Sequence, residues 1–191
     1  MKKFIATVLL VVGIGFIGYS AWELVDTNNQ QTHSMVQATE TIQKGRDNHE
    51  MREQFNPSQN ETIGVLRIPK IDAELPIVEG TNPDDLKKGV GHYSGTAFPS
   101  DHDQILLSGH RDTVFRRFGE IQKGDEFIVE LPYGTFHYKM DHARIVKADD
   151  TTVIAPTKPN EVLILSTCYP FRYIGSAPDR YIIYAYPVEK P

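Results

Sequence analysis

An uninterrupted apolar segment opens the chain. Residues 4–21 carry no charged side chain and consist mostly of Ile, Val, Leu, Phe and Gly, after a short basic start. The segment has the minimum length that spans a bilayer, and Trp22 follows it where an interfacial aromatic residue is expected. We predict a membrane anchor over residues 1–22, with the basic end inside and the rest of the chain outside. A cleaved signal peptide is the alternative, because Gly18-Tyr19-Ser20 loosely fits a cleavage site, and it would export the protein equally.

The polar pattern of residues 23–59 differs from both of its neighbours. Gln, Asn, Thr, Glu and Lys are interleaved there, and the sparse apolar residues make a weak helical pattern at best. Such a composition favours a stalk that is partly helical or disordered. We therefore expect this segment to lift the following domain off the membrane.

Short apolar runs, bounded by Gly, Pro, Asn and Asp, begin at residue 62. Runs of this length and punctuation are typical of β-strands. They fall at residues 63–68, 73–78, 91–94, 104–108, 126–131, 135–146, 161–167 and 180–188. Eight short strands in one domain predict a small closed β-barrel over residues 60–191.

One short helix is expected between the second and third strands. Asn82 is placed to cap it, Pro83 to be its first residue and Gly89 to end it. The fold class is therefore mostly β, with one or two short helices beside the barrel and a transmembrane helix before it.

Composition narrows the function. The 191 residues suffice for one ordinary domain and an appendage, and the formal net charge is −5. No basic stripe is present, so we expect no nucleic-acid partner. The single cysteine excludes an intramolecular disulfide. No acidic cluster has metal-ligand spacing, so we expect no metal or cofactor, while a calcium requirement stays open.

That single cysteine, Cys168, ends an apolar run. Residues 163–167 lead directly into it, and Pro170 stops the strand two positions later. A thiol at a strand end faces the mouth of a barrel. A buried, inert cysteine is an equally good interpretation of the position, because free cysteine often behaves as a small hydrophobe. An unpaired thiol on an exported protein nevertheless calls for a reason.

A histidine and an arginine end or begin strands in a similar way. Residues 105–108 run into Gly109 and then His110, and among seven histidines only His110 ends an apolar run. A hydrogen-bonded loop histidine is the alternative. Arg180 opens the last strand and would reach the same mouth if that strand lies beside the Cys168 strand; a solvated edge charge is the alternative. Arg172 competes with Arg180, but it lies in the loop between the last two strands.

These residues together resemble the sortase family. Leu165-Ser166-Thr167-Cys168 is followed twelve residues later by Arg180, and Ser108-Gly109-His110 lies upstream. Cys168-Tyr169-Pro170-Phe171 and the residues around Arg180 are most similar to class D sortases. The resemblance covers residues 62–187. It departs at Ile164, where many sortases carry Thr.

The resemblance implies an eight-stranded sortase barrel and a cysteine transpeptidase on the outer face of a Gram-positive cell. Cys168 would be the nucleophile, His110 the proton-transfer residue and Arg180 the group that holds the oxyanion. The implied partners are secreted proteins that bear a Leu-Pro-x-Thr-like sorting signal and the amine of a cell-wall precursor. Thr167 is expected to contact the substrate. Val153, Ile154 and Ala155 are expected to form an apolar pocket for the Leu-Pro of the signal, and their being ordinary core residues is an equally good interpretation.

Other classes of protein remain open from the residues alone. The first alternative is a different exported Cys/His enzyme, such as an L,D-transpeptidase or a cell-wall peptidase. L,D-transpeptidases, however, place Gly before the nucleophile, where this chain has Thr167, and papain-like peptidases place Cys before His. A membrane-tethered barrel that binds wall polymer, with Cys168 inert, is the other.

Overall fold

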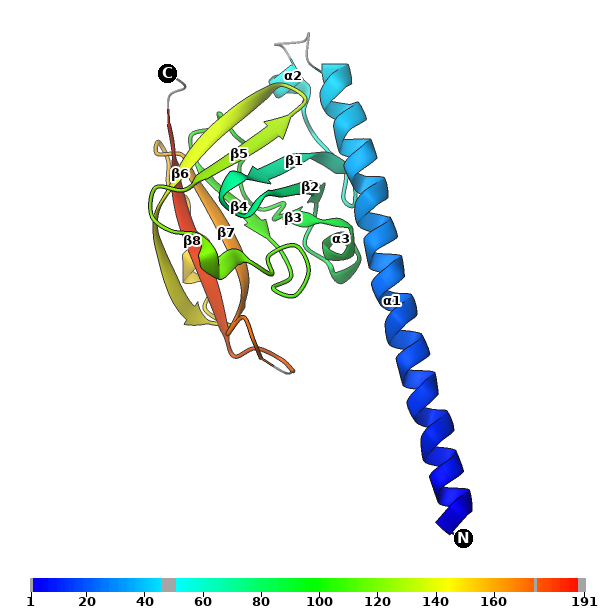
Figure 1. The fold of residues 1–191 in the computed structure, drawn as a ribbon. Helices are drawn as coiled ribbons and strands as arrows, with labels where there is room; N and C mark the ends of the chain where they lie inside the picture. The colour runs from blue at the N-terminus through cyan, green and yellow to red at the C-terminus, as the bar shows by residue number, and fades with distance from the viewer. Residues whose placement is uncertain (1, 46–50, 174, 189–191) are drawn as a thin grey trace.

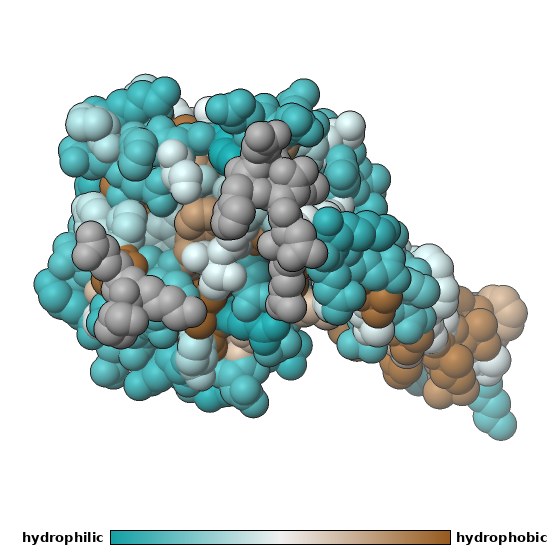
Figure 2. Space-filling view, turned by 90° about the horizontal axis from the view of Figure 1, so that it is seen from above, coloured by the Kyte–Doolittle hydropathy of each residue, from teal (hydrophilic) through white to brown (hydrophobic). Residues whose placement is uncertain are grey.

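A single long helix precedes the body of the molecule. The computed structural model describes residues 2–45, 51–173 and 175–188, and the helix α1 (Lys2–Gly45) passes along one side of the body and continues well beyond it (Figure 1). The projecting half carries exposed apolar side chains, which gather as brown surface in Figure 2. This half is long and apolar enough to cross a membrane and is a candidate membrane anchor.

The segment expected to be a partly helical or disordered stalk is helical over most of its length. α1 continues without a break to Gly45, and residues 46–50 of the predicted stalk lie outside the described residues. Ser34, Ala38 and Ile42 are buried. Their spacing of four puts them on one helix face, and Ala38 and Ile42 pack with Val65 of the barrel. The second half of α1 is therefore docked on the domain.

Eight strands form the closed barrel that the sequence predicts, in the order β1-β2-β3-β4-β7-β8-β6-β5 (Figure 1). Their bounds are β1 (Thr62–Ile68), β2 (Ala73–Glu79), β3 (Val90–His92), β4 (Gln104–Ser108), β5 (Glu126–Leu131), β6 (Gly134–Lys147), β7 (Val162–Tyr169) and β8 (Asp179–Pro187). The β2–β3 and β4–β7 contacts are parallel, and the other contacts are antiparallel. The parallel β4–β7 contact joins segments that are far apart in the sequence.

Short helices fill the connections. The expected helix is present as α3 (Pro83–Lys88), where the Asn82 backbone N–H donates to the Asp85 carboxylate at 2.9 Å, as in a capping box. The others are α2 (Met51–Gln54), η1 (Pro69–Ile71), η2 (Phe118–Glu120) and η3 (Thr151–Val153). Because β2 and β3 are parallel, α3 forms the crossover between them.

Apolar side chains cover both faces of the barrel wall around β4, β7 and β8. Inside, large side chains such as Phe115, Phe127 and Tyr138 fill the core. Outside, a second group packs on the wall; this outer cluster comprises Leu106, Val146, Val162, Ile164 and Ile182. A strand that is apolar on both faces has a continuous run of hydrophobic residues. This is why the sequence predicts these strands clearly.

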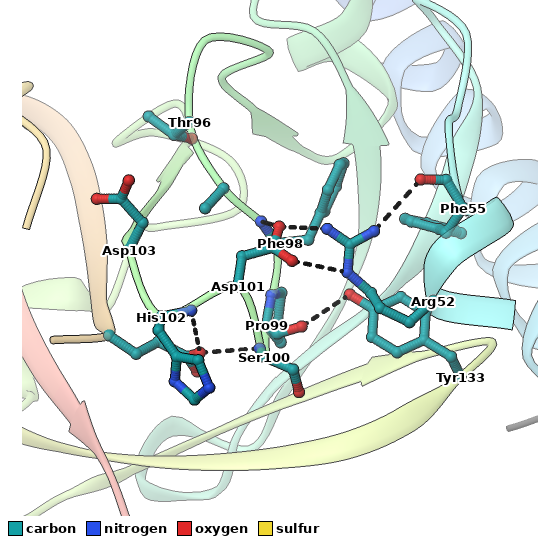
Figure 3. Close-up of polar contacts among 12 residues, drawn as sticks. Arg52, Phe55, Thr96, Phe98, Pro99, Ser100, Asp101, His102, Asp103 and Tyr133 are labelled. Atoms are coloured by element: carbon teal, nitrogen blue, oxygen red, sulfur yellow. Dashed lines mark hydrogen bonds and ion pairs between the residues drawn. The ribbon is translucent and has the colours of Figure 1, made fainter. Parts of the chain in front are cut away.

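The segment after α1 is clamped to the loop that leads into β4 (Figure 3). Arg52 of α2 forms an ion pair with Asp101, with its Nε 3.0 Å from Oδ1. Its guanidinium carbon also lies 5.4 Å from the ring centre of Phe98 and 5.6 Å from that of Tyr133. These contacts fix the loop of residues 93–103, and with it the start of β4.

Candidate active site

The parallel strands β4 and β7 bring His110 beside Cys168. Their register pairs Ser108 with Ser166, and the pairing continues one step further, because the Gly109 N–H donates to the Ser166 carbonyl at 3.0 Å. His110 lies two positions after Ser108, and Cys168 lies two positions after Ser166. The two side chains therefore belong to the same level of adjacent chains.

Strand β8 brings Arg180 to the same level as His110 and Cys168. It pairs with β7 in antiparallel fashion, and Arg180 is the register partner of Cys168. The expectation that the last strand lies beside the Cys168 strand is thus confirmed. Side chains of directly opposed residues have Cβ atoms about 5 Å apart, so the side chains of Arg180 and Cys168 start from neighbouring positions.

All three residues belong to the outer face of the wall. Alternate residues of a strand point to the same side, and the outer cluster gives the phase on each strand through Leu106, Ile164 and Ile182. Counting by twos along each chain leads to His110, Cys168 and Arg180. The thiol is half-buried and unpaired. The candidate site is therefore a row across three chain segments, open on the outside of the barrel.

The turn after β4 holds His110 in place. Residues 111–117 fold back so that the Phe115 N–H donates to the His110 carbonyl at 3.0 Å. The side chains of Val114 and Phe115 are buried beneath the turn. A Cβ on Gly109 would lie 2.6 Å from Val114 Cγ2, so glycine is needed here to let the turn pack against the strand.

Arg172 lies in the connection between β7 and β8, whereas Arg180 lies in β8 itself. Arg180 is half-buried, and its Nη1 donates to the carbonyls of Ala177 at 3.3 Å and Asp179 at 3.0 Å. Arg172 is exposed. The guanidinium of Arg180 is thus restrained at the start of β8, while the choice of Arg180 over Arg172 stays a prediction.

A third arginine, which sequence reasoning did not select, joins the two halves of the site. Arg111 donates from Nη1 to the Pro170 carbonyl at 3.1 Å, and from Nη2 to the carbonyls of Tyr173 at 2.7 Å and Gly175 at 3.0 Å. It thereby ties the histidine-bearing turn to the loop that follows Cys168. The only signal in the sequence is its position next to His110.

Aromatic side chains pack where the chain leaves β7. Phe171 meets Tyr169 and Tyr181 with ring centres 5.3 Å and 5.2 Å apart. Burial raises the pKa of Tyr181. This cluster fixes the backbone on the C-terminal side of Cys168.

The residues expected to bind substrate lie in two places. Thr167 is buried on the opposite face of β7 from Cys168, and its Oγ1 donates to the Gly109 carbonyl at 2.7 Å. Its side chain therefore links the strands, and it could meet a substrate only through its backbone. Val153 and Ile154 pack on the outer cluster, on the same face as the thiol. Ala155 follows, with its N–H donating to Gln104 Oε1 at 3.2 Å.

Other histidines of the barrel are engaged away from this row. Their Nδ1 atoms contact carboxylates in the pairs His92–Glu79 at 2.6 Å, His137–Glu126 at 2.8 Å and His142–Asp141 at 2.9 Å. His92, His137 and His142 therefore have carboxylate partners of their own, whereas the β4–β7 register brings His110 to the level of Cys168. In the part of the chain that the structure describes, no three His, Cys, Asp or Glu side chains gather as metal ligands would.

Comparison of the sequence with known proteins identifies the sortase family. A family model described as "Sortase domain" matches residues 66–188. Sortase D from Bacillus subtilis (strain 168) is 46% identical over an alignment of 193 residues. The alignment covers 96% of this chain and 98% of that protein.

Comparison of the fold gives the same family. A Clostridium perfringens Sortase D5 transpeptidase superimposes with a TM-score of 0.74 at 22% identity, covering 84% of this chain and 99% of the other. The catalytic domain of SrtD from B. anthracis superimposes with a TM-score of 0.60 at 41% identity, covering 71% of this chain and 93% of that domain.

Proposed function

The chain belongs to the sortase family of transpeptidases, and on that premise we propose that Cys168, His110 and Arg180 transfer a sorted protein to an amine through a thioester. The observation that carries the assignment is the row itself. The registers of β4 with β7 and of β7 with β8 bring His110, Cys168 and Arg180 to one level of three neighbouring chain segments. A purely structural cysteine has no need of such neighbours.

The first half of the reaction is cleavage of a Leu-Pro-x-Thr-like sorting signal. The Cys168 thiolate attacks the carbonyl carbon of the signal's Thr, because the thiolate is the nucleophilic form of cysteine. The C–N bond to the next residue then breaks, and its electron pair leaves with the amine. His110 gives that amine a proton as general acid. The product is a thioester on Cys168.

Arg180 stabilises the negative charge that develops on the attacked carbonyl oxygen. A guanidinium is planar and permanently charged, and it can donate two hydrogen bonds to one acceptor. The bonds of Nη1 to the carbonyls of Ala177 and Asp179 restrain this group at the start of β8, and Cys168 is the register partner of Arg180. Little reorganisation is then needed when the oxyanion forms.

The second half regenerates the enzyme. An acceptor amine attacks the thioester carbonyl and gives its proton to His110, which is neutral after the first half. The C–S bond breaks and Cys168 leaves as the thiolate. One peptide bond is broken and one amide is formed, so no external energy source is required. We propose a cell-wall precursor as the source of this amine.

The outer cluster supports the location of the signal. Ile164 lies four residues before Cys168 on the same face, which is about 13 Å along a strand. An extended Leu-Pro-x-Thr peptide whose Thr lies at the thiol spans roughly that distance. Val153 and Ile154 border the same apolar surface, so the Leu-Pro pair would bind between them and the strand.

The proposal includes a place of action. α1 would anchor the enzyme in the membrane, with the barrel on the outer face where secreted proteins and wall precursors meet. The basic residues at the N-terminal end of the apolar segment support this orientation.

The direct test is detection of the thioester. The full chain, in detergent or lipid discs, is incubated with a library of Leu-Pro-x-Thr-x peptides and its intact mass is recorded. We expect a mass increase equal to the N-terminal fragment, and its absence in Cys168→Ala. A folded Cys168→Ala protein that still cleaves the peptide would overturn the mechanism. A thiol that reacts with labelling reagents only after unfolding would favour the inert wall-binding barrel.

A further inference from the structure

The projecting helix forms one wall of a cavity into which His110 faces. The cavity has a volume of about 570 Å³, within the range typical of ligand sites. Its helical wall is a face of α1 that is polar except for Leu24 and carries Ser20, Glu23, Leu24, Thr27, Asn28 and Gln31. This spacing of three and four is one face of a helix, and the same face continues into the docked half of α1.

The opposite wall belongs to the catalytic domain. The turn after β4 contributes His110, Asp112 and Thr113, and α3 contributes Lys87. Asp112 is exposed, and its carbonyl accepts hydrogen bonds from Arg116, so its carboxylate can serve a ligand. The cavity therefore joins a proton-transfer residue to a polar face of the anchor helix.

The cavity lies along α1 at the point where the apolar segment ends. The uncharged apolar segment ends at Ala21, and Glu23 is the first charged residue after it. Ser20 and Glu23 both line the cavity. If α1 spans the membrane, the cavity opens at the level of the lipid headgroups.

We propose that this cavity binds the amine-bearing acceptor of the second half-reaction, an inference that rests on the function proposed above. The acceptor must approach His110, which takes its proton, and it must do so while the sorting signal still occupies the outer cluster. The residues that line the cavity, as far as the structure describes them, include no member of that cluster. The two substrates would thus reach the thioester from different sides.

The charges of the cavity fit an amine. Glu23 and Asp112 are carboxylates, whereas the one lysine on its wall, Lys87, has its Nζ 3.7 Å from an oxygen of Asp84. Carboxylates in a cleft raise the local concentration of a cationic ligand. An ammonium group drawn in this way loses one proton to solvent, and the resulting amine attacks the thioester and passes a second proton to His110.

Separate measurement of the two half-reactions tests the proposal. The full chain is placed in lipid discs and acylated with a fluorescent Leu-Pro-x-Thr peptide that it cleaves. The release of the leaving fragment reports acylation. Transfer is then measured to a dipeptide with a free lysine side-chain amine, either dissolved or attached to a lipid of the disc. The two presentations distinguish a soluble acceptor from a membrane-bound one.

A matched pair of variants isolates the cavity. Asn28→Trp fills it from the helix side, whereas Asn29→Trp places the same bulk on an exposed position outside it. We expect Asn28→Trp to slow transfer by about tenfold or more through misplacement of the amine, with acylation and slow hydrolysis unchanged. Asn29→Trp should match the wild type. Glu23→Gln should raise the KM for the amine several-fold, and Glu40→Gln, on an exposed part of α1, should not.

The outcomes separate this proposal from the function it rests on. Equal transfer by Asn28→Trp and Asn29→Trp, with normal acylation, would overturn the cavity assignment and leave the transpeptidase mechanism intact. Loss of acylation in Asn28→Trp alone would assign the cavity to the sorting signal instead. A wild-type chain that forms no thioester would overturn both.

Discussion

The chemistry of each functional residue depends on where its strand stops. His110 and Cys168 follow parallel strands at the same level, and Arg180 begins the neighbouring antiparallel strand. The sequence indicated these positions because an apolar run that ends abruptly in a polar side chain has few structural explanations. The fact that the three meet could not be derived from spacing, because it depends on the β4–β7 and β7–β8 registers.

Removal of the imidazole is the first residue-scale prediction. His110→Ala should lower the rate of peptide cleavage by roughly a hundred- to ten-thousandfold, because the leaving amine is no longer protonated. His33→Ala, on an exposed position of α1, is the control and should be fully active. Single-turnover release of the leaving fragment measures both. Near-normal cleavage by His110→Ala would exclude it as the general acid.

The second residue-scale prediction compares three arginine variants. Arg180→Ala should lower turnover by about a hundred- to a thousandfold, the typical cost of one lost oxyanion donor. Arg180→Lys should recover part of this, because it keeps the charge but not the planar fork. Arg172→Ala should cost only about tenfold, through loop ordering. Peptide-cleavage rates decide, with folding checked by circular dichroism. If Arg172→Ala proved inactive and Arg180→Ala active, the two roles would be exchanged.

At the scale of elements, the loop after β7 is held from outside itself. Three of its carbonyls accept hydrogen bonds from Arg111. No sequence pattern could show this, because the acceptors are backbone atoms of residues 170–175 and carry no side-chain signature. Arg111 is thus a positioning residue for the thiol and the imidazole together.

Loss of that tie should loosen the loop without unfolding the barrel. We expect Arg111→Ala to lower kcat for peptide cleavage by about tenfold to a hundredfold, the range for small misplacements of reacting groups, with a smaller change in KM. Arg111→Lys should restore little, because one ammonium cannot span three carbonyls. Arg116→Ala, which affects only the carbonyl of Asp112, is the control. Faster proteolysis within residues 170–178 would accompany the effect; an unchanged kcat would contradict the positioning role.

The strands and α1 show what a sequence pattern can and cannot predict. All eight strands lie within two residues of their predicted bounds, because Gly, Pro and Asn punctuate short apolar runs. The docked half of α1 was missed because its contact face is built from Ser34 and Ala38, with one larger residue, Ile42. Small residues let a helix approach closely, yet they leave almost no amphipathic signal.

For the whole molecule, the structure predicts that removal of the candidate anchor lowers the free energy of unfolding but leaves a folded domain. A chain without residues 1–45 keeps the Arg52 clamp and should be soluble and able to form the thioester. It should lose about 1–3 kcal/mol of unfolding free energy, because the burial of Ala38 and Ile42 against Val65 is lost. A chain without residues 1–59 should be less stable still. Thermal unfolding and intact mass give both values, and a truncated chain that is folded but cannot be acylated would place part of the site on the helix.

The unbroken run of α1 also sets a working height. Ser34, the first buried residue of α1, lies thirteen positions after Ala21, where the apolar segment ends. At ~1.5 Å per helical residue that is about 20 Å of rigid rod. An enzyme anchored in a membrane this way would not search the volume around the cell. It would diffuse in two dimensions, and only partners that present their reactive groups within that shallow layer would meet it at a high effective concentration.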